Sequence, residues 1–204
     1  PKCGGGNHFC GTTSLDGQTL IALVRDAVRE FARHGVTRLV LVDGHYENQW
    51  FVTEGIQLAM RELGQGTALE VMRLEHWDFC TEQTLAAVFP DGFPGFALEH
   101  AAVIETSLML HLRPDLVRQS ALKTFPSLGQ QLVARGGTLG VEKPVGFGWM
   151  TQDLNPEGAC GDATQASAAK GAAVLDHMAE GLAKLLQDVI ALPLDTLRDG
   201  PLPT

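Results

Sequence analysis

The sequence is poor in positive charge and has no long apolar run. Its 204 residues include 15 lysines and arginines against 24 aspartates and glutamates, a formal net charge of −9 at pH 7. Binding to nucleic-acid phosphates or to acidic membranes needs clustered lysine and arginine, so we expect neither partner. No apolar run approaches the roughly 20 residues that span a bilayer, and no charged segment followed by an apolar stretch opens the chain.

Cysteine is scarce and widely spaced. Cys3, Cys10, Cys80 and Cys160 form no C-x-x-C pair, so the sequence indicates neither a zinc ribbon nor a disulfide framework. Reduced thiols in a cytoplasmic protein are the simpler interpretation. The sequence also lacks a G-x-S-x-G motif, which argues against a serine hydrolase triad.

The apolar content is that of a globular protein. With 45% hydrophobic and 19% charged residues the chain can bury a core, and we expect a single domain over residues 1–204. Its first residues, Pro1 to Gly6, are typical of the inside of a loop and include no initiator methionine. We therefore expect a fragment that is incomplete at the amino terminus.

Apolar spacing predicts an α/β protein. In the first part it predicts a helix at 17–34, a strand at 38–43, a helix at 50–63 and a strand at 68–74. Asp16 is the expected N-cap of the first helix and Gly35 its C-terminal stop. This alternation predicts right-handed crossovers in a parallel sheet.

The second part shows weaker periodicity. It predicts a helix at 99–112, long loops with one or two short strands at 120–155, a closing helix at 161–190 and a poorly packed tail at 193–204.

His45 and Glu47 lie directly after the strand at 38–43. Ligands bind at the carboxyl ends of parallel strands, and nitrogen and oxygen donors suit zinc or manganese. The pair therefore indicates a metal site, although a histidine and a glutamate in a loop are more often merely exposed.

Glu99, His100 and Glu105 form a second acidic and imidazole cluster. The histidine could exchange protons near neutral pH; the alternative is a helix-start glutamate beside an incidental histidine. Trp77 and Phe96 flank polar segments and could sandwich a planar ligand, although core packing is the usual fate of an aromatic side chain.

Several motifs, taken in order, resemble the creatininase family over nearly the full chain. Residues 4–17 resemble its GGGNHFPGTTSLDG with Cys10 in place of proline, 44–48 its GHYEN, 74–79 its YWDF segment, 99–110 its EHGGVFETSLML, and 158–171 its GxxGD...KG pattern.

The resemblance implies a layered α/β/α fold with a mostly parallel sheet, a homohexamer, and two divalent metal ions, zinc or manganese. It implies hydrolysis of a small cyclic amide, creatinine to creatine. His45 and Glu47 would each ligate a different ion, with Glu47 also catalytic. Tyr46 and Trp77 would lie against the substrate, and His100 would move the proton during ring opening with Glu99 beside it.

The chain departs from the family pattern at three places. Phe96 and Ala97 replace a Trp-Asp pair, and Cys3 replaces a serine, all at expected substrate contacts. The family also takes an E-x-H pair and a bridging aspartate from a preceding segment, so we expect little hydrolase activity from this chain alone. Another amide, lactam or formamide therefore stays open as the substrate, as does a non-catalytic relative.

Overall fold

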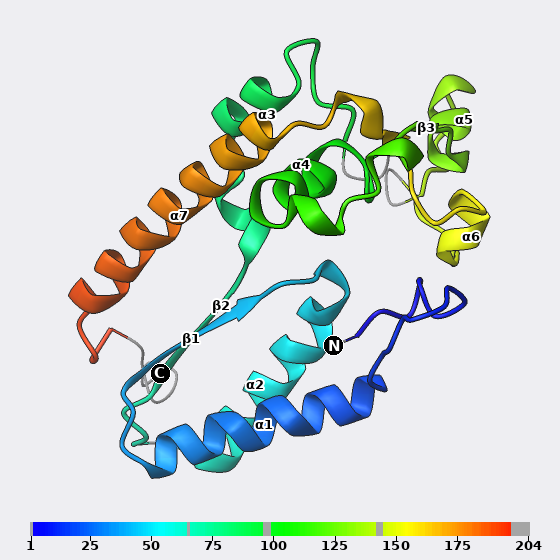
Figure 1. Ribbon diagram of the computed structural model, residues 1–204. Coiled ribbons are helices and arrows are strands. Elements are labelled where there is room, and N and C mark those ends of the chain that lie inside the picture. The colour runs from blue at the N-terminus through cyan, green and yellow to red at the C-terminus, as the bar shows by residue number, and fades with distance from the viewer. Residues whose placement is uncertain (1, 65, 96–98, 142–144, 197–204) are drawn as a thin grey trace. The chain divides into compact units, whose positions relative to one another are not determined.

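The computed structural model describes residues 2–64, 66–95, 99–141 and 145–196 (Figure 1). The chain divides into two compact units. The first comprises Pro1–Gly4, Thr13–Asp78 and Gly181–Thr204, and the second comprises Gly5–Thr12 and Phe79–Glu180. The expected single domain over residues 1–204 stays a prediction.

Helix α1 (Gly17–Arg33) opens the regular part of the first unit, as the apolar spacing predicts. The Asp16 carboxylate accepts a hydrogen bond from the Gln18 N–H at 2.8 Å, so it is the predicted N-cap. Gly35 has a φ of +77°, a conformation that glycine adopts without strain, and it ends the helix as predicted.

Two parallel strands follow. Strand β1 (Arg38–Asp43) pairs with β2 (Glu70–Glu75) over their whole length, and α2 (Gln49–Leu63) makes the connection between them. The expected parallel pairing is thus confirmed, with β2 displaced by one or two residues from the predicted 68–74. In register, Asp43 at the end of β1 lies opposite Glu75 at the end of β2.

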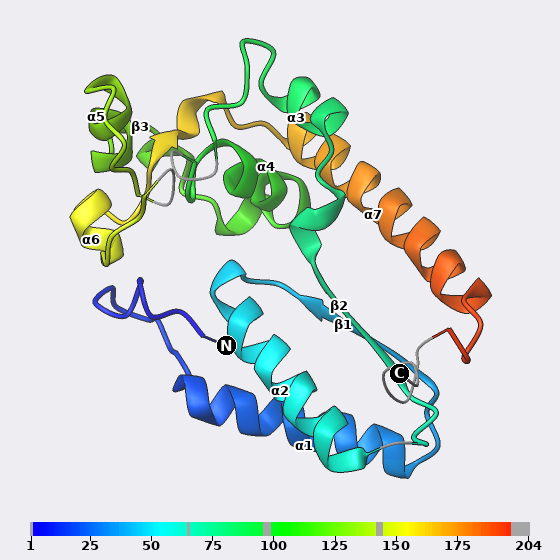
Figure 2. The same cartoon turned by 180° about the vertical axis from the view of Figure 1, so that it is seen from behind.

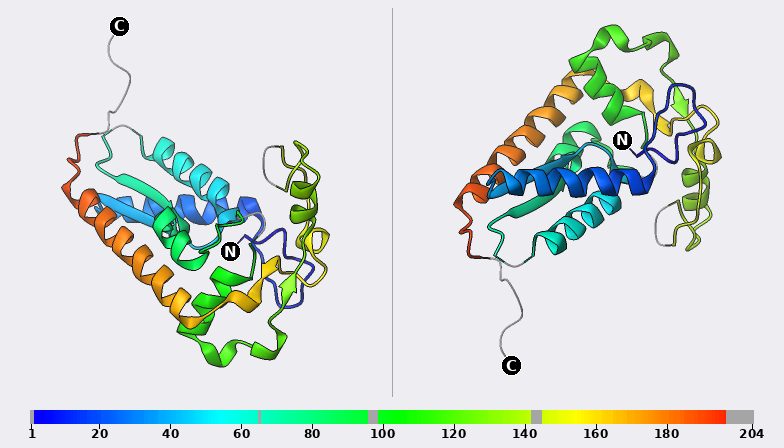
Figure 3. Two further views of the ribbon diagram at one scale, coloured as in Figure 1. Left: turned by 90° about the horizontal axis from the view of Figure 1, so that it is seen from above. Right: turned by 90° about the horizontal axis from the view of Figure 1, so that it is seen from below.

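Both helices pack on these strands. Figures 1 and 3 show α1 and α2 side by side along the strand pair. Their shared core is centred on the buried side chains of Val28, Ala59 and Leu69. At Gly55 an added Cβ would lie 2.8 Å from the Val24 Cβ, so a side chain there would push the two helices apart.

The second unit is mainly helical (Figure 2). Its elements are α3 (Glu82–Val88), α4 (Val103–Leu112), β3 (Thr124–Phe125), α5 (Leu128–Ala134), α6 (Thr151–Leu154), β4 (Gly161–Asp162) and α7 (Ala168–Ala191). Strands β3 and β4 pair antiparallel, and α7 begins in the second unit and ends in the first. With its helical majority and small parallel sheet, the chain has the expected α/β class.

Short 3₁₀ turns connect these elements. They are η1 (Tyr46–Asn48), η2 (His76–Phe79), η4 (Pro114–Leu116), η5 (Gln119–Ala121) and η6 (Ala163–Gln165).

Several boundaries in the second unit differ from the sequence prediction. Helix α4 begins at Val103 rather than at 99, because His100 instead exchanges backbone hydrogen bonds with Cys160, at 2.9 and 2.8 Å. The stretch predicted as loops contains α5, whose capping box joins Ser127 and Gln130. Helix α7 starts at Ala168 rather than at 161, since Gly161 pairs in β4.

Residues 193–196 of the predicted tail are exposed, and the remainder lies outside the described residues. Within the described ranges, no helix combines the length and apolarity that crossing a membrane requires.

Candidate metal centre

The loop after β1 is organised by a buried aspartate. Asp43 is only 7% exposed, and its Oδ1 accepts hydrogen bonds from the His45 N–H at 3.0 Å and from the Asn48 Nδ2 at 2.8 Å. An aspartate that accepts from a backbone amide two residues on closes a tight local turn. The turn places Tyr46–Asn48 in η1 and leaves His45 and Glu47 half-buried at the strand end.

Asn48 also holds the start of the chain against this loop. Its Oδ1 accepts a hydrogen bond from the Lys2 N–H at 2.8 Å. The next amide, that of Cys3, donates to the Ser14 Oγ at 2.9 Å. These two contacts hold the backbone amides of Lys2 and Cys3 in place.

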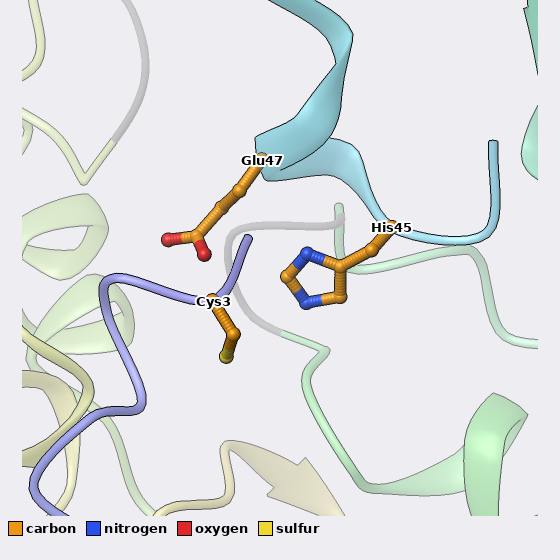
Figure 4. A group of neighbouring side chains, drawn as sticks. All are labelled: Cys3, His45 and Glu47. Atoms are coloured by element: carbon orange, nitrogen blue, oxygen red, sulfur yellow. The ribbon is translucent and has the colours of Figure 1, made fainter. Parts of the chain in front are cut away.

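Cys3, His45 and Glu47 therefore form one group. One ligand atom of each lies within 4.8 Å of those of the other two, and among the described residues this is the one group of three or more histidine, cysteine or acidic side chains that meets this criterion. In Figure 4 both ring nitrogens of His45 face the side on which the cysteine sulfur and the carboxylate lie. The His45 Nδ1 is buried without a hydrogen-bond partner among the described residues. Because buried polar atoms are usually hydrogen-bonded, this nitrogen is a candidate metal-ligating atom.

A hollow of about 430 Å³ adjoins the group within the first unit. His45, Asp43 and Asn48 form its polar part, and Leu20 and Val42 are among the apolar side chains that form the rest. A small ligand with one polar and one apolar side would match this lining.

Two aromatic side chains were expected against the substrate in this unit. Tyr46 is 49% exposed and meets the Trp50 ring edge-on, with centroids 5.2 Å apart. Trp77 lies in η2, just after β2, and its ring packs on the His76 ring with centroids 4.6 Å apart. The His76 Nδ1 lies 3.2 Å from the Asp43 carbonyl oxygen, so this segment contacts the strand end that carries His45 and Glu47.

The second cluster belongs to the second unit. Glu99 is buried, and its Oε1 accepts a hydrogen bond from the Ile104 N–H at 2.8 Å. Burial raises the pKa of Glu99 to about 7; the hydrogen bond from Ile104 opposes this rise, and the nearby Glu105 charge adds to it. The carboxyl is thus poised between its neutral and charged forms near neutral pH.

His100 is exposed beside Glu99, and its Nδ1 lies 4.0 Å from the Glu105 Oε2. Ala101 donates its N–H to the same carboxylate and adopts a φ of +53°, unusual for a residue with a side chain. Phe96 and Ala97 lie outside the described residues, and the convergence of His100 with His45 stays a prediction.

The structure thus brings together three residues for which the sequence predicts two different roles. Cys3 was expected to contact the substrate, whereas His45 and Glu47 were expected to bind metal ions. Sequence reasoning missed the supporting residues Asp43 and Asn48. An aspartate directly before a glycine at a strand end was the available signal for the turn.

A family model and a known relative both match this chain. The family model described as "Creatininase: Creatinine amidohydrolase" matches residues 2–186. The chain is 55% identical over 119 residues to the creatinine amidohydrolase of Pseudomonas putida. That alignment covers 57% of this chain and 46% of the relative, so the chain matches a little under half of that protein's length.

Solved structures give the same result. The chain resembles a crystal structure of creatinine amidohydrolase with a TM-score of 0.77 at 40% identity, covering 94% of this chain and 71% of that one. At the same identity it resembles a mutant creatininase of Zn-Zn type, with a TM-score of 0.76 and coverage of 92% and 69%. It also resembles a manganese creatininase and a mutant complexed with creatine, each with a TM-score of 0.75 and coverage of 92% and 70%.

Proposed function

Because the chain belongs to the creatininase family, we propose that it serves a metal-dependent amidohydrolase that opens a small cyclic amide, with creatinine, converted to creatine, as the leading substrate. The observation that carries the proposal is the ligand group at the end of β1, where the buried His45 Nδ1 lacks a partner among the described residues. Such donors at the carboxyl edge of a parallel sheet are suited to binding a divalent ion and a ligand together.

Divalent ions are the proposed cofactors, two per active site, zinc or manganese. Relatives with 40% identity are described as Zn-Zn and manganese forms. His45 and Glu47 would each hold one ion, following the resemblance of residues 44–48. When bound, such ions polarise a carbonyl and lower the pKa of water.

The side chains of the protein itself position the substrate and move its proton. Tyr46 offers an exposed phenol beside the ligand group, and Trp77 a planar wall tied to the same strand end. His100 is an exposed imidazole whose role is to deliver a proton to the ring nitrogen that leaves. Glu99 can donate or accept a hydrogen bond to substrate near neutral pH, because its pKa is about 7.

The test is to join this chain to a family segment that carries the E-x-H pair and the bridging aspartate, to supply zinc or manganese, and to measure creatine formed from creatinine, beside a set of lactams and formamides. His100→Ala should abolish turnover, whereas His111→Ala, which alters an exposed histidine on α4, should not. Metal binding without turnover of any of these compounds would favour a non-catalytic relative. Turnover confined to another amide would replace creatinine as the substrate.

Specificity is proposed to depend on Phe96 and Ala97, where the chain leaves the family pattern. In the chain joined to the family's E-x-H and aspartate segment, changing them to tryptophan and aspartate should raise creatinine turnover relative to other cyclic amides by roughly tenfold to a hundredfold, since one hydrogen bond to substrate is worth about 1–3 kcal/mol. An equal change for all substrates would mean that the two side chains do not contact the ring.

A cytoplasmic homohexamer is the proposed setting. The absence of a membrane-crossing helix among the described residues is compatible with it. Size-exclusion chromatography with light scattering tests the assembly.

A further inference from the structure

We propose that Glu105 is a positioning residue for His100, and that it holds the Nδ1 side of the imidazole so that Nε2 is the nitrogen that exchanges protons with the substrate. The inference deepens the proposed function and rests on it for the proton-transfer role of His100. What is new is the partner of the histidine and the choice of the nitrogen that works.

The two side chains lie close together at the start of α4. The His100 Nδ1 is 4.0 Å from the Glu105 Oε2, and the side chains are 49% and 52% exposed. This separation is about 1 Å longer than a hydrogen bond. Rotation about side-chain torsions closes it without any movement of the backbone.

The backbone around His100 is held by contacts on both sides. His100 exchanges two backbone hydrogen bonds with Cys160, at 2.9 and 2.8 Å. The next residue, Ala101, donates its N–H to the Glu105 Oε2, and its carbonyl oxygen accepts from the Thr106 Oγ1 at 3.3 Å. The same Glu105 oxygen therefore binds the backbone next to His100 and lies beside its ring.

The conformation of Ala101 makes this contact significant. Its φ of +53° is unusual for a residue with a side chain. Strained backbone of this kind persists only where surrounding contacts hold it, and it is concentrated at functional sites. Glu105 and Thr106 supply those contacts, so the direction in which the His100 side chain leaves the backbone depends on them.

The neighbouring Glu99 is engaged elsewhere. It is buried, and its Oε1 accepts the Ile104 N–H at 2.8 Å, within the first turn of α4. Glu105 is thus the acidic side chain that lies beside the Nδ1 of His100.

A carboxylate beside Nδ1 determines what Nε2 can do. In a neutral imidazole one nitrogen carries the hydrogen and the other a lone pair, and an acceptor beside Nδ1 favours the hydrogen there. Nε2 then takes a proton from the attacking water and passes it to the ring nitrogen that leaves as the carbon–nitrogen bond breaks. Nδ1 keeps its hydrogen throughout, and the carboxylate stabilises the imidazolium that forms between the two transfers.

The tautomer of His100 is the first readout. In protein with ¹⁵N-labelled histidine, the ring-nitrogen signals distinguish Nδ1–H from Nε2–H, and His100→Ala identifies this residue among the seven histidines. Neutral His100 should be mainly Nδ1–H in the unmodified chain. Glu105→Gln should shift the majority to Nε2–H, because a neutral amide oxygen is a weaker acceptor than a carboxylate. A mainly Nε2–H histidine in the unmodified chain, or the same tautomer in both proteins, would overturn the proposal.

Thr106→Val is the matched control. It removes the other side-chain hydrogen bond to Ala101 and leaves the carboxylate beside His100, so the tautomer should not change. Glu105→Gln keeps an oxygen that can accept the Ala101 N–H, and circular dichroism checks that both variants fold. An equal shift of tautomer in Thr106→Val would mean that the backbone contacts rather than the carboxylate orient the imidazole, which would overturn the proposal.

Kinetics provide a second readout. In the chain joined to the family's E-x-H and aspartate segment, Glu105→Gln should lower kcat for amide hydrolysis by about 10- to 100-fold while KM changes less than about threefold. A buried carboxylate beside a catalytic histidine would contribute more, because solvent screens these two exposed side chains. Thr106→Val should change kcat far less than Glu105→Gln does. An unchanged kcat in Glu105→Gln would overturn the proposal.

These measurements separate the proposal from the proposed function. A tautomer that depends on Glu105, in a joined protein that hydrolyses no amide, would support the positioning of His100 and contradict the amidohydrolase. Amide hydrolysis with both tautomer and kcat unaffected by Glu105→Gln would overturn the positioning role and leave the amidohydrolase in place.

Discussion

Asp43 is the residue on which the geometry of the candidate site depends most directly. Its Oδ1 accepts from the His45 N–H and from the Asn48 side chain, at 3.0 and 2.8 Å, and Asn48 connects onward to Lys2. Asp43→Ala leaves both donors without their acceptor. We expect the variant to lose stability and metal affinity together.

The loss of stability follows from these two hydrogen bonds. A buried donor left unsatisfied costs about 1–3 kcal/mol. The Asn48 side chain is buried, whereas the His45 amide is only partly buried, so the two together give about 2–4 kcal/mol. Asp43→Asn keeps an oxygen in the same place and should lose less than about 1 kcal/mol.

Metal affinity should fall because His45 loses the hydrogen bond that positions its backbone at the strand end. Residues that orient metal ligands typically change affinity by about 10- to 100-fold. Urea denaturation of the metal-free proteins measures the stability, and zinc titration at one pH measures the affinity. If Asp43→Asn were as damaging as Asp43→Ala, the carboxylate charge rather than the hydrogen bonds would hold the loop, and our reasoning would be refuted.

Three further substitutions, with Ala179→Gly as a control, test the second unit. The pKa of about 7 for Glu99, against an ordinary value of 4.5, means that the folded state holds the proton more tightly. Wild-type stability should therefore fall as pH rises from about 4.5 to about 7, and Glu99→Gln should remove this fall in denaturation curves taken across that range. Ala101→Gly should stabilise the protein by about 0.5–1 kcal/mol in thermal melts, because the strain relieved at the positive φ is larger than the cost of the added unfolded-state entropy. A loss of stability in this variant would contradict backbone strain at Ala101. Gly171→Ala should destabilise by about 1–3 kcal/mol, because an added Cβ would lie 2.0 Å from the Ser107 carbonyl oxygen. Ala179→Gly, at an exposed position of α7, measures the helix-propensity difference between alanine and glycine, which is about 1 kcal/mol. If Gly171→Ala causes no loss of stability after this difference is subtracted, Gly171 is not closely packed.

The sequence was informative where one local signal dominates. Helix α1 carries a periodic apolar face, an aspartate cap and a terminating glycine, and all three were found in the structure. The short helices α3, α5 and α6 were missed, because helices of one or two turns show little periodicity. For α5 the Ser127 and Gln130 capping box was a readable signal that composition rich in glycine and proline obscured.

The environment of Cys3 could not be predicted in the same way. Nothing in the residues next to it indicates a partner, because its position depends on hydrogen bonds to Ser14 and, through Lys2, to Asn48, which are contacts made by the folded chain. The backbone of Ala101 is a similar case, since alanine itself gives no sign of a positive φ. Such features follow from tertiary packing, which overrides local preference.

The loop from Asp43 to Asn48 assigns structural and chemical tasks to different residues. Asp43 and Asn48 are buried and bonded to each other, whereas His45 and Glu47 between them are half-buried and contribute to the ligand group. Tyr46, between these two residues, is exposed. A change of Asp43 or Asn48 should therefore alter the stability of the protein and the position of His45 together. A change of the His45 or Glu47 side chain should leave the hydrogen bonds of the turn in place. We therefore expect that the side chains of His45 and Glu47 can be changed without disrupting the strand end that supports them.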